Sequence, residues 1–179
     1  TKSHLVARDI DILAEMAKDD LVRVYVSITT LDPALKRTLE PRAPAPAARL
    51  NAVRALNEAK IPVGVMVAPI IPVVNDHEIE RILEAAVDSG AQSAGFVMLR
   101  LPYEVKDLFR EWLAAHYPLR AGHVMSLVQQ MRGGKDNDPE FLKQAAALRL
   151  RVEPPVVLSG DSTPVSLHIE QMYLPGQPG

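Results

Sequence analysis

Residues 21–28 read LVRVYVSI, and this stretch decides the fold class. It is short, almost wholly apolar and rich in valine, isoleucine and tyrosine, a composition typical of a β-strand that is covered on both faces. Apolar residues recur at helical spacing over residues 8–18, so a helix is expected just before it. The strand is followed by a turn over residues 29–33, in which Pro33 can open a short helix at its first position.

The strand–helix cycle then repeats along the chain. Asn75, with Glu78 three residues later, predicts a capping box at the start of one helix, and Gly90 predicts a left-handed cap at its end. Gly133-Gly134 is expected to stop the last helix. We expect the further elements at residues 47–60 (helix), 62–68 (strand), 79–87 (helix), 94–99 (strand), 105–113 (helix) and 119–131 (helix).

This alternation predicts an α/β fold with a parallel sheet and right-handed crossovers. Repeats of roughly 35 residues fit a βα barrel or a doubly wound sheet, but three strands are too few for a closed eight-stranded barrel. Residues 1–3 (TKS) resemble the end of a strand that precedes the chain, so we expect the C-terminal half of something larger. The folded part is predicted over residues 1–134, and proline density predicts an irregular, partly disordered tail over 135–179.

The composition excludes several classes of site. The chain has 179 residues, a net charge of −2 and no cysteine. Balanced charge gives no indication of a nucleic-acid partner, and no apolar run reaches the roughly 18–20 residues of a membrane helix, so a cytoplasmic chain is expected. Without cysteine these residues hold no disulfide, no thiolate nucleophile and no thiolate-bound zinc or iron–sulfur cluster. No histidine spacing predicts a metal site either.

Candidate binding residues follow from the expected strand ends, because ligands of parallel βα folds lie at the carboxyl ends of the strands. These positions hold Lys2, Ser27, Thr29, Thr30 and Arg100. The two cations suit a carboxylate or phosphate, and the hydroxyls suit an amino group or a ribose. The alternative is that Ser27 and Thr29 only cap the turn that follows them.

Several short motifs, in their order and spacing, carry a resemblance to a known family. The chain resembles a bacterial radical S-adenosylmethionine (radical SAM) protein, in the branch similar to spore photoproduct lyase. The resemblance extends from Thr1 to about Phe141. The motifs are residues 1–3 (TKS), 26–32 (VSITTLD), 39–42 (LEPR), 69–78 (PIIPVVNDHE) and 131–135 (MRGGK).

The resemblance implies a partial (β/α)₆ barrel, of which this chain would hold roughly the second half. Such proteins bind a [4Fe–4S] cluster through an N-terminal CxxxCxxC loop, and reductive cleavage of S-adenosylmethionine gives a 5′-deoxyadenosyl radical. By position, Lys2 would lie near the carboxylate of this small-molecule cosubstrate and Ser27 near its amino group or ribose. Thr29 and Thr30 would support that wall, and Arg100 would follow the sixth strand.

The cluster motif is absent from these residues, so the chain is expected to be inactive unless an N-terminal half supplies it. Two other functions remain open at this stage. The chain can be a cofactor-free half-barrel that pairs an open sheet edge with another subunit or copy, or a non-functional remnant. An aldolase that uses Lys2 as a Schiff-base amine is a further, weaker alternative.

Overall fold

A computed structural model describes residues 1–131 and Gly134. Short 3₁₀ turns precede two of the helices. Within the described residues, no helix combines the length and apolarity that crossing a bilayer requires. In chain order the elements are η1 (His4–Asp9), α1 (Ile10–Lys18), β1 (Val24–Ser27), α2 (Pro33–Leu39), α3 (Pro46–Glu58), β2 (Val63–Ile70), η2 (Asp76–Glu78), α4 (Ile79–Asp88), β3 (Ser93–Met98), α5 (Val105–His116) and α6 (Ala121–Gln130).

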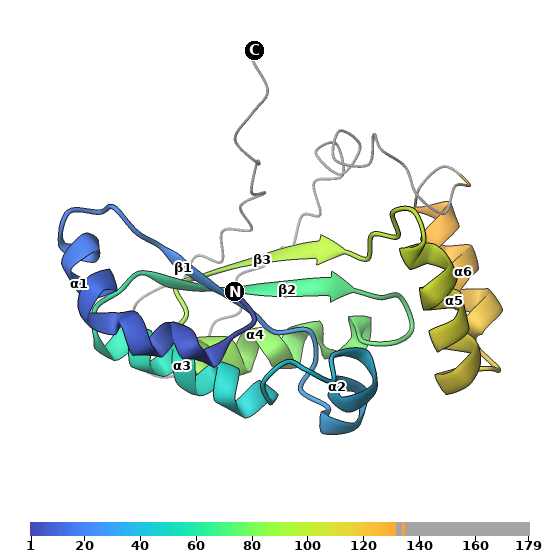
Figure 1. The fold of residues 1–179 in the computed structure, drawn as a ribbon, viewed down its shortest axis with the longest axis horizontal. Helices are drawn as coiled ribbons and strands as arrows, with labels where there is room; N and C mark the ends of the chain where they lie inside the picture. Colours follow the sequence, from blue (N-terminus) through green and yellow to red (C-terminus); the bar gives the residue numbers. More distant parts are fainter. Residues whose placement is uncertain (132–133, 135–179) are drawn as a thin grey trace, which may run out of the picture.

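The three strands form one parallel sheet in the order β1-β2-β3 (Figure 1). Val24 of β1 aligns with Val63 of β2, and Gly64 of β2 aligns with Ser93 of β3. The predicted α/β class and the parallel pairing are therefore confirmed. The described part of the chain contains these three strands as an open sheet, and closure into a barrel remains a prediction.

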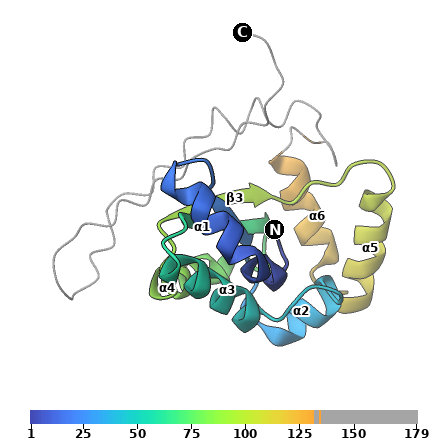
Figure 2. The same cartoon turned by 60° about the vertical axis from the view of Figure 1, so that its left-hand side comes forward.

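One face of the sheet is covered by α3 and α4, with α1 beside α3 (Figures 1 and 2). Alternate strand residues point into this layer, and Val26 and Val65 are completely buried. They meet the apolar stripes of the helices, which include Val53, Leu56 and Ile82. The helices therefore bury one face of β1 and β2, as βα units require.

The opposite face of β1 departs from the prediction of a strand covered on both sides. Tyr25 and Ser27 are only half-buried, so burial alternates along the strand. The tyrosine ring lies across Gly64, where an added Cβ would sit 2.6 Å from the ring. At the far side of Gly64 the Ser93 hydroxyl donates to the Tyr25 phenol oxygen at 3.2 Å. Because the Tyr25 ring is apolar and its hydroxyl is polar, this residue suits a strand face that is partly exposed to solvent.

A second apolar cluster lies at the carboxyl end of the sheet, where α5 and α6 pack on the segments that follow β2 and β3 (Figure 1). Phe109 and Leu113 of α5 are buried there, as predicted. Three other apolar residues of the two segments predicted as helices are exposed, because Val105 is 43%, Leu108 is 60% and Leu119 is 99% exposed. Leu119 precedes α6, which begins at Ala121, so the predicted start of this helix was two residues too early.

The predicted start of α2 and the predicted glycine caps after α4 and α6 agree with the backbone. Asp32 caps α2 by accepting a hydrogen bond from the Ala34 amide at 2.7 Å, with Pro33 in the first turn. Gly90 has φ of +90° after α4, and Gly134 has φ of +86°. The Gly134 amide donates to the Gln129 carbonyl at 2.8 Å, which closes α6. Gly133 and the predicted tail over residues 135–179 lie outside the described residues.

Substitution by alanine should have opposite effects at Gly90, which follows α4, and at Gly122, in the first turn of α6. Gly90→Ala should lower the free energy of unfolding by about 1–3 kcal/mol, because φ is positive and the new Cβ would lie 2.3 Å from the side-chain nitrogen Nδ2 of Asn57. Gly122→Ala, in the first turn of α6 with no atom within 4 Å of the new Cβ, should raise it by about 0.5–1 kcal/mol. Urea unfolding of both variants measures this, and equal effects at the two positions would contradict the assignment.

Candidate functional site

Four of the five predicted site residues lie in or next to the segment that ends β1. Ser27 is the last residue of β1, Thr29 and Thr30 follow it, and Lys2 precedes η1. The Lys2 ammonium lies 3.4 Å from the Thr29 hydroxyl oxygen. The structure therefore brings together two of the predicted polar side chains, which are 27 positions apart in the chain.

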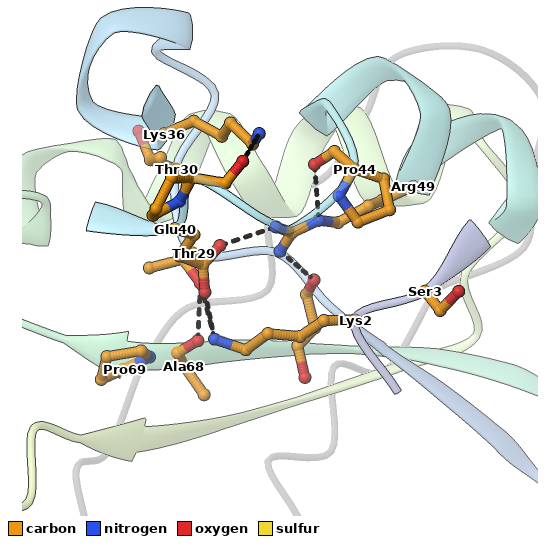
Figure 3. Close-up of polar contacts among 12 residues, drawn as sticks. Lys2, Ser3, Thr29, Thr30, Lys36, Glu40, Pro44, Arg49, Ala68 and Pro69 are labelled. Atoms are coloured by element: carbon orange, nitrogen blue, oxygen red, sulfur yellow. Dashed lines mark hydrogen bonds and ion pairs between the residues drawn. The ribbon is translucent and has the colours of Figure 1, made fainter. Parts of the chain in front are cut away.

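The carboxylate of Glu40 is the centre of this group (Figure 3). Glu40 follows α2, and its side chain is 10% exposed. Its Oε1 accepts a hydrogen bond from Lys2 Nζ and lies 3.0 Å from the Thr29 hydroxyl. Its Oε2 accepts from Arg49 Nη2 at 2.6 Å. We refer to these three charged residues as the Lys2–Glu40–Arg49 cluster.

Arg49 connects the cluster to the backbone. Its side chain lies in α3 and is only 2% exposed. The guanidinium donates to the Ser27 carbonyl at 2.8 Å and to the Pro44 carbonyl at 3.2 Å, in addition to Glu40. A planar fork with several fixed donors suits this arrangement, and a lysine could not reproduce it. One buried cation therefore fixes the end of β1, the proline-containing loop and Glu40 relative to one another.

The pKa of Glu40 lies below the ordinary glutamate range. Burial opposes ionisation and by itself raises this pKa, but hydrogen bonds from Lys2 and Arg49, with their positive charges, outweigh it. The carboxyl is therefore ionised at neutral pH. Two cations and one carboxylate leave the cluster with a net charge of +1. Because the Lys2 side chain is 42% exposed, that excess positive charge is accessible to an anionic group.

Thr30 turns away from the cluster. Its hydroxyl donates to Glu78 Oε1 at 2.5 Å and accepts from the Asp32 amide at 2.9 Å. The other oxygen of Glu78 accepts from the Leu31 amide at 2.9 Å. Glu78 is 3% exposed, so this buried carboxylate holds the turn after β1 in place. Thr30 therefore supports the turn and does not face the cluster.

The predicted capping box of Asn75 and Glu78 is wrong, because both side chains are engaged elsewhere. Asn75 is 1% exposed, and its Oδ1 accepts from the Ile71 amide at 2.7 Å. Its Nδ2 donates to the Thr29 carbonyl at 2.7 Å and to the Pro69 carbonyl at 3.0 Å. These bonds reach the segment after β1, the last residues of β2 and the loop that follows β2, so Asn75 ties the end of β1 to the end of β2 and thereby positions Thr29.

Ser27 and Arg100 are placed differently from the other candidates. Ser27 contributes its backbone, whose amide donates to the Thr1 carbonyl at 2.8 Å and whose carbonyl accepts from Arg49. Its side chain is half-buried on the sheet face that the helices leave uncovered. Arg100 is exposed after β3, which β2 separates from β1. Among the described residues Arg100 makes no hydrogen bond or ion pair, so it lies outside the cluster.

A separate groove with a volume of about 500 Å³ lies beyond the Thr30 turn. None of the five predicted residues lines it. Tyr117 is one of its lining residues, and burial, followed by the negative charges of Asp32 and Glu78, raises the pKa of its phenol, against the lowering effect of Arg120. Acidic and basic side chains are mixed on its walls, so the groove offers no single charge to a ligand.

The sequence interpretation missed Glu40 and Arg49 as site residues. Glu40 stood inside one of the motifs quoted above, but its spacing alone gave it no role. Arg49 precedes Val53 and Leu56 by four and seven residues, which places a cation on the buried face of its helix. A cation on an apolar face needs a buried partner, and this signal was available in the sequence.

Asn75→Asp should lower the free energy of unfolding by about 2–4 kcal/mol. The change replaces two donated hydrogen bonds with a buried carboxylate that faces the carbonyls of Thr29 and Pro69. Asn51→Asp is the matched control, because Asn51 is exposed and its carbonyl oxygen accepts from Arg54 in either form. Urea unfolding at pH 7 measures both, and an Asn75 variant as stable as the control would contradict the proposed role.

The stability of the chain should depend on pH through Glu40. A carboxyl whose pKa is lowered on folding contributes stability that is present above its unfolded pKa, near 4.3, and is lost as the pH falls through its folded pKa. Compared with Glu40→Gln, the wild-type chain should therefore be more stable at pH 7, and the difference should shrink below about pH 4.5.

Urea unfolding across pH 3–7 tests this dependence on Glu40. Glu15→Gln is the control, because Glu15 is 73% exposed and should show almost no difference from the wild type. A difference between the wild-type and Glu40→Gln chains that is constant with pH would contradict the assignment.

The residues present fit one of the two groups that the radical SAM resemblance implies and not the other. A [4Fe–4S] cluster of this kind is held by cysteine thiolates, and the chain has no cysteine. No set of three or more histidine, aspartate or glutamate side chains is arranged as metal ligands within the described residues. The Lys2–Glu40–Arg49 cluster, in contrast, offers the positive charge and hydrogen-bond donors that a ligand carboxylate requires.

Comparison with known proteins finds relatives in mycobacteria and in a virus. The chain is 31% identical over 182 residues to uncharacterized proteins of Mycobacterium tuberculosis and Mycobacterium bovis, which covers 99% of this chain and 52% of each relative. It is 40% identical over 104 residues to an uncharacterized protein of Acidianus two-tailed virus, covering 55% of this chain and 34% of that protein. The chain thus spans about half the length of the mycobacterial relatives.

No solved structure gives a significant match to the chain. A family model does match, over residues 1–86, and this range contains Lys2, Ser27, Thr29 and Thr30 as well as Glu40 and Arg49. The family it describes is the radical SAM superfamily, and the match supports placing the chain in that superfamily.

Proposed function

We propose that this chain forms the part of a radical SAM enzyme that holds the methionine end of S-adenosylmethionine. The observation that carries the proposal is the Lys2–Glu40–Arg49 cluster, which lies at the carboxyl end of a parallel strand and has a net charge of +1. Ligands of βα folds bind at such strand ends, and a carboxylate is the group that an accessible ammonium and its neighbouring hydroxyl recognise. S-Adenosylmethionine carries one carboxylate at its methionine end.

Each of the predicted site residues would make a different contribution to the binding of S-adenosylmethionine. The Lys2 ammonium meets the ligand carboxylate, because it is the exposed member of the cluster. Ser27 provides a hydroxyl on the uncovered sheet face for an amino group or the ribose, and Thr29 supports Lys2 from behind. Thr30 keeps the adjoining turn rigid through Glu78, and Arg100 adds a second cation at the end of β3.

The radical chemistry itself requires residues beyond this chain. When bound at a reduced [4Fe–4S] cluster, S-adenosylmethionine supplies the 5′-deoxyadenosyl radical of this superfamily. The cluster ligands would come from an N-terminal half that carries cysteines, with which the three strands described here would complete a (β/α)₆ barrel. The order of the short motifs favours the branch similar to spore photoproduct lyase within the superfamily.

The alternative functions gain less support. The Lys2 ammonium is engaged by Glu40 and Thr29, whereas a Schiff-base amine must be free to attack a carbonyl. An interaction module that adds a strand at β1 would compete with bonds already present on that edge. The Thr1 ammonium donates to the Tyr25 carbonyl at 2.8 Å, and Arg49 occupies the Ser27 carbonyl.

Binding of S-adenosylmethionine tests the proposal directly. Isothermal titration calorimetry should detect binding to the chain when it is co-expressed with the cysteine-bearing N-terminal half. Lys2→Met should raise the dissociation constant about tenfold or more, because it removes the charged donor for the carboxylate. Lys18→Met is the matched control, since Lys18 is an exposed lysine paired with Glu15 on α1. Wild-type affinity in the Lys2 variant would refute the proposed site.

A further inference from the structure

We infer that Glu40 is a positioning residue for the cosubstrate carboxylate, and that it acts by holding the Lys2 ammonium in place while Arg49 holds Glu40. The inference rests on the proposed function, in which Lys2 is the residue that meets the carboxylate. It adds a residue that touches Lys2 and Arg49 and has no part of its own in the proposed contacts with the ligand.

Without polar partners the Lys2 side chain would be flexible. A lysine side chain has four rotatable bonds and loses considerable rotamer entropy when it is fixed in one position. Lys2 is 42% exposed, so packing alone does not fix it. Glu40 Oε1 and the Thr29 hydroxyl each accept a hydrogen bond from Nζ. An ammonium has three N–H donors, and two fixed acceptors leave the third available to a ligand.

The Glu40 carboxylate is held in a fixed position by Arg49. The carboxylate is 10% exposed, and Arg49 Nη2 donates to the oxygen that Lys2 does not use. Arg49 is 2% exposed and is itself fixed by the carbonyls of Ser27 and Pro44. The position of Lys2 is therefore set by groups that become ordered when the chain folds. A ligand then meets an ammonium that is already oriented, which lowers the entropy cost of binding.

Loss of the Glu40 charge would have two opposing effects on the binding of a ligand carboxylate. Removing the Glu40 charge would change the cluster from +1 to +2 and strengthen its long-range attraction for a carboxylate. The same change would free the ammonium on a half-exposed, flexible stem, where solvent screens its charge. If positioning dominates, loss of Glu40 weakens binding of the carboxylate. If net charge dominates, the same loss strengthens it.

The test is a thermodynamic cycle between Glu40 and the ligand carboxylate. Dissociation constants are measured by calorimetry for S-adenosylmethionine and for its decarboxylated analogue, using the chain co-expressed with its N-terminal half. Glu40→Gln should weaken binding of S-adenosylmethionine about tenfold and leave binding of the analogue nearly unchanged. A purely structural role would weaken both ligands alike, and tighter binding of S-adenosylmethionine would overturn the inference.

Further variants separate the Lys2 route from a general effect. Glu40→Asp keeps the carboxylate and should restore part of the affinity. In a Lys2→Met background, Glu40→Gln should cause no additional loss, because the residue through which it acts is gone. Glu15→Gln breaks an exposed Glu–Lys pair elsewhere and should bind both ligands as the wild type does. An additional loss in the Lys2→Met background would overturn the proposed route.

A measurement without ligand keeps the inference testable if Glu40→Gln is unstable or the chain does not bind S-adenosylmethionine. The double variant Glu40→Gln with Arg49→Met removes the buried cation together with its counter-ion, which avoids leaving an unpaired charge. In the double variant and in Glu40→Gln, site-resolved acetylation of Lys2 should become several-fold faster relative to Lys18, as judged by mass spectrometry.

The outcomes of these two measurements are distinct. Faster labelling with no binding by the wild type would refute the proposed function and with it the carboxylate role of Glu40. Unchanged labelling of Lys2 would overturn the positioning inference whatever the binding result.

Discussion

The rest of the site depends on the guanidinium of Arg49, which is almost completely buried. A buried cation is tolerated only when its charge and its donors are met, and this one is met by Glu40 and two backbone carbonyls. Glu40 follows α2, Pro44 lies in the loop before α3, and Ser27 ends β1. Because the guanidinium is planar, satisfying it fixes the relative orientation of all three segments. Helix α3 thus does more than cover the sheet, since it also carries the residue that organises the strand end.

The corner at Thr29 and Thr30 separates two polar networks. On one side, Thr29 contacts Lys2 and Glu40 of the Lys2–Glu40–Arg49 cluster, which is accessible through Lys2 and carries excess positive charge. On the other, Thr30 joins the buried carboxylate of Glu78 and shapes the turn. Asn75 bonds the peptide between them to the end of β2. Adjacent residues with the same hydroxyl chemistry therefore have different surroundings, one beside the exposed ammonium of Lys2 and one within the buried turn.

Much of the fold was predictable from the sequence because local signals and burial agree in it. The strands, the parallel pairing, Asp32–Pro33 and Gly90 all follow from apolar spacing and turn chemistry. The errors arose where tertiary contacts redirect a side chain. Asn75 and Glu78 have capping-box spacing, but the Asn75 side-chain oxygen accepts from the Ile71 amide, and the Glu78 carboxylate accepts from Thr30, 48 residues away. Leu119 continued an apolar pattern, although the helix starts after it. The strand-end rule nominated Lys2 and Thr29, whose role in binding stays a prediction, whereas the contacts of Glu40 depend on the folded loop.

The tyrosine that crosses the uncovered sheet face has a consequence for how this region can vary. Tyr25 lies over Gly64 and reaches Ser93, so the three strands share one small surface at a single level of the sheet. A larger residue at position 64 would collide with the ring, and a smaller residue at position 25 would leave a hollow above the glycine. An added Cβ at position 64 would also lie 2.5 Å from the Ser93 hydroxyl oxygen and 2.9 Å from the Ser93 backbone carbonyl, so a smaller side chain at position 25 would not by itself make room for it. Position 64 is therefore restricted to glycine by the backbone of β3 as well as by the ring of Tyr25.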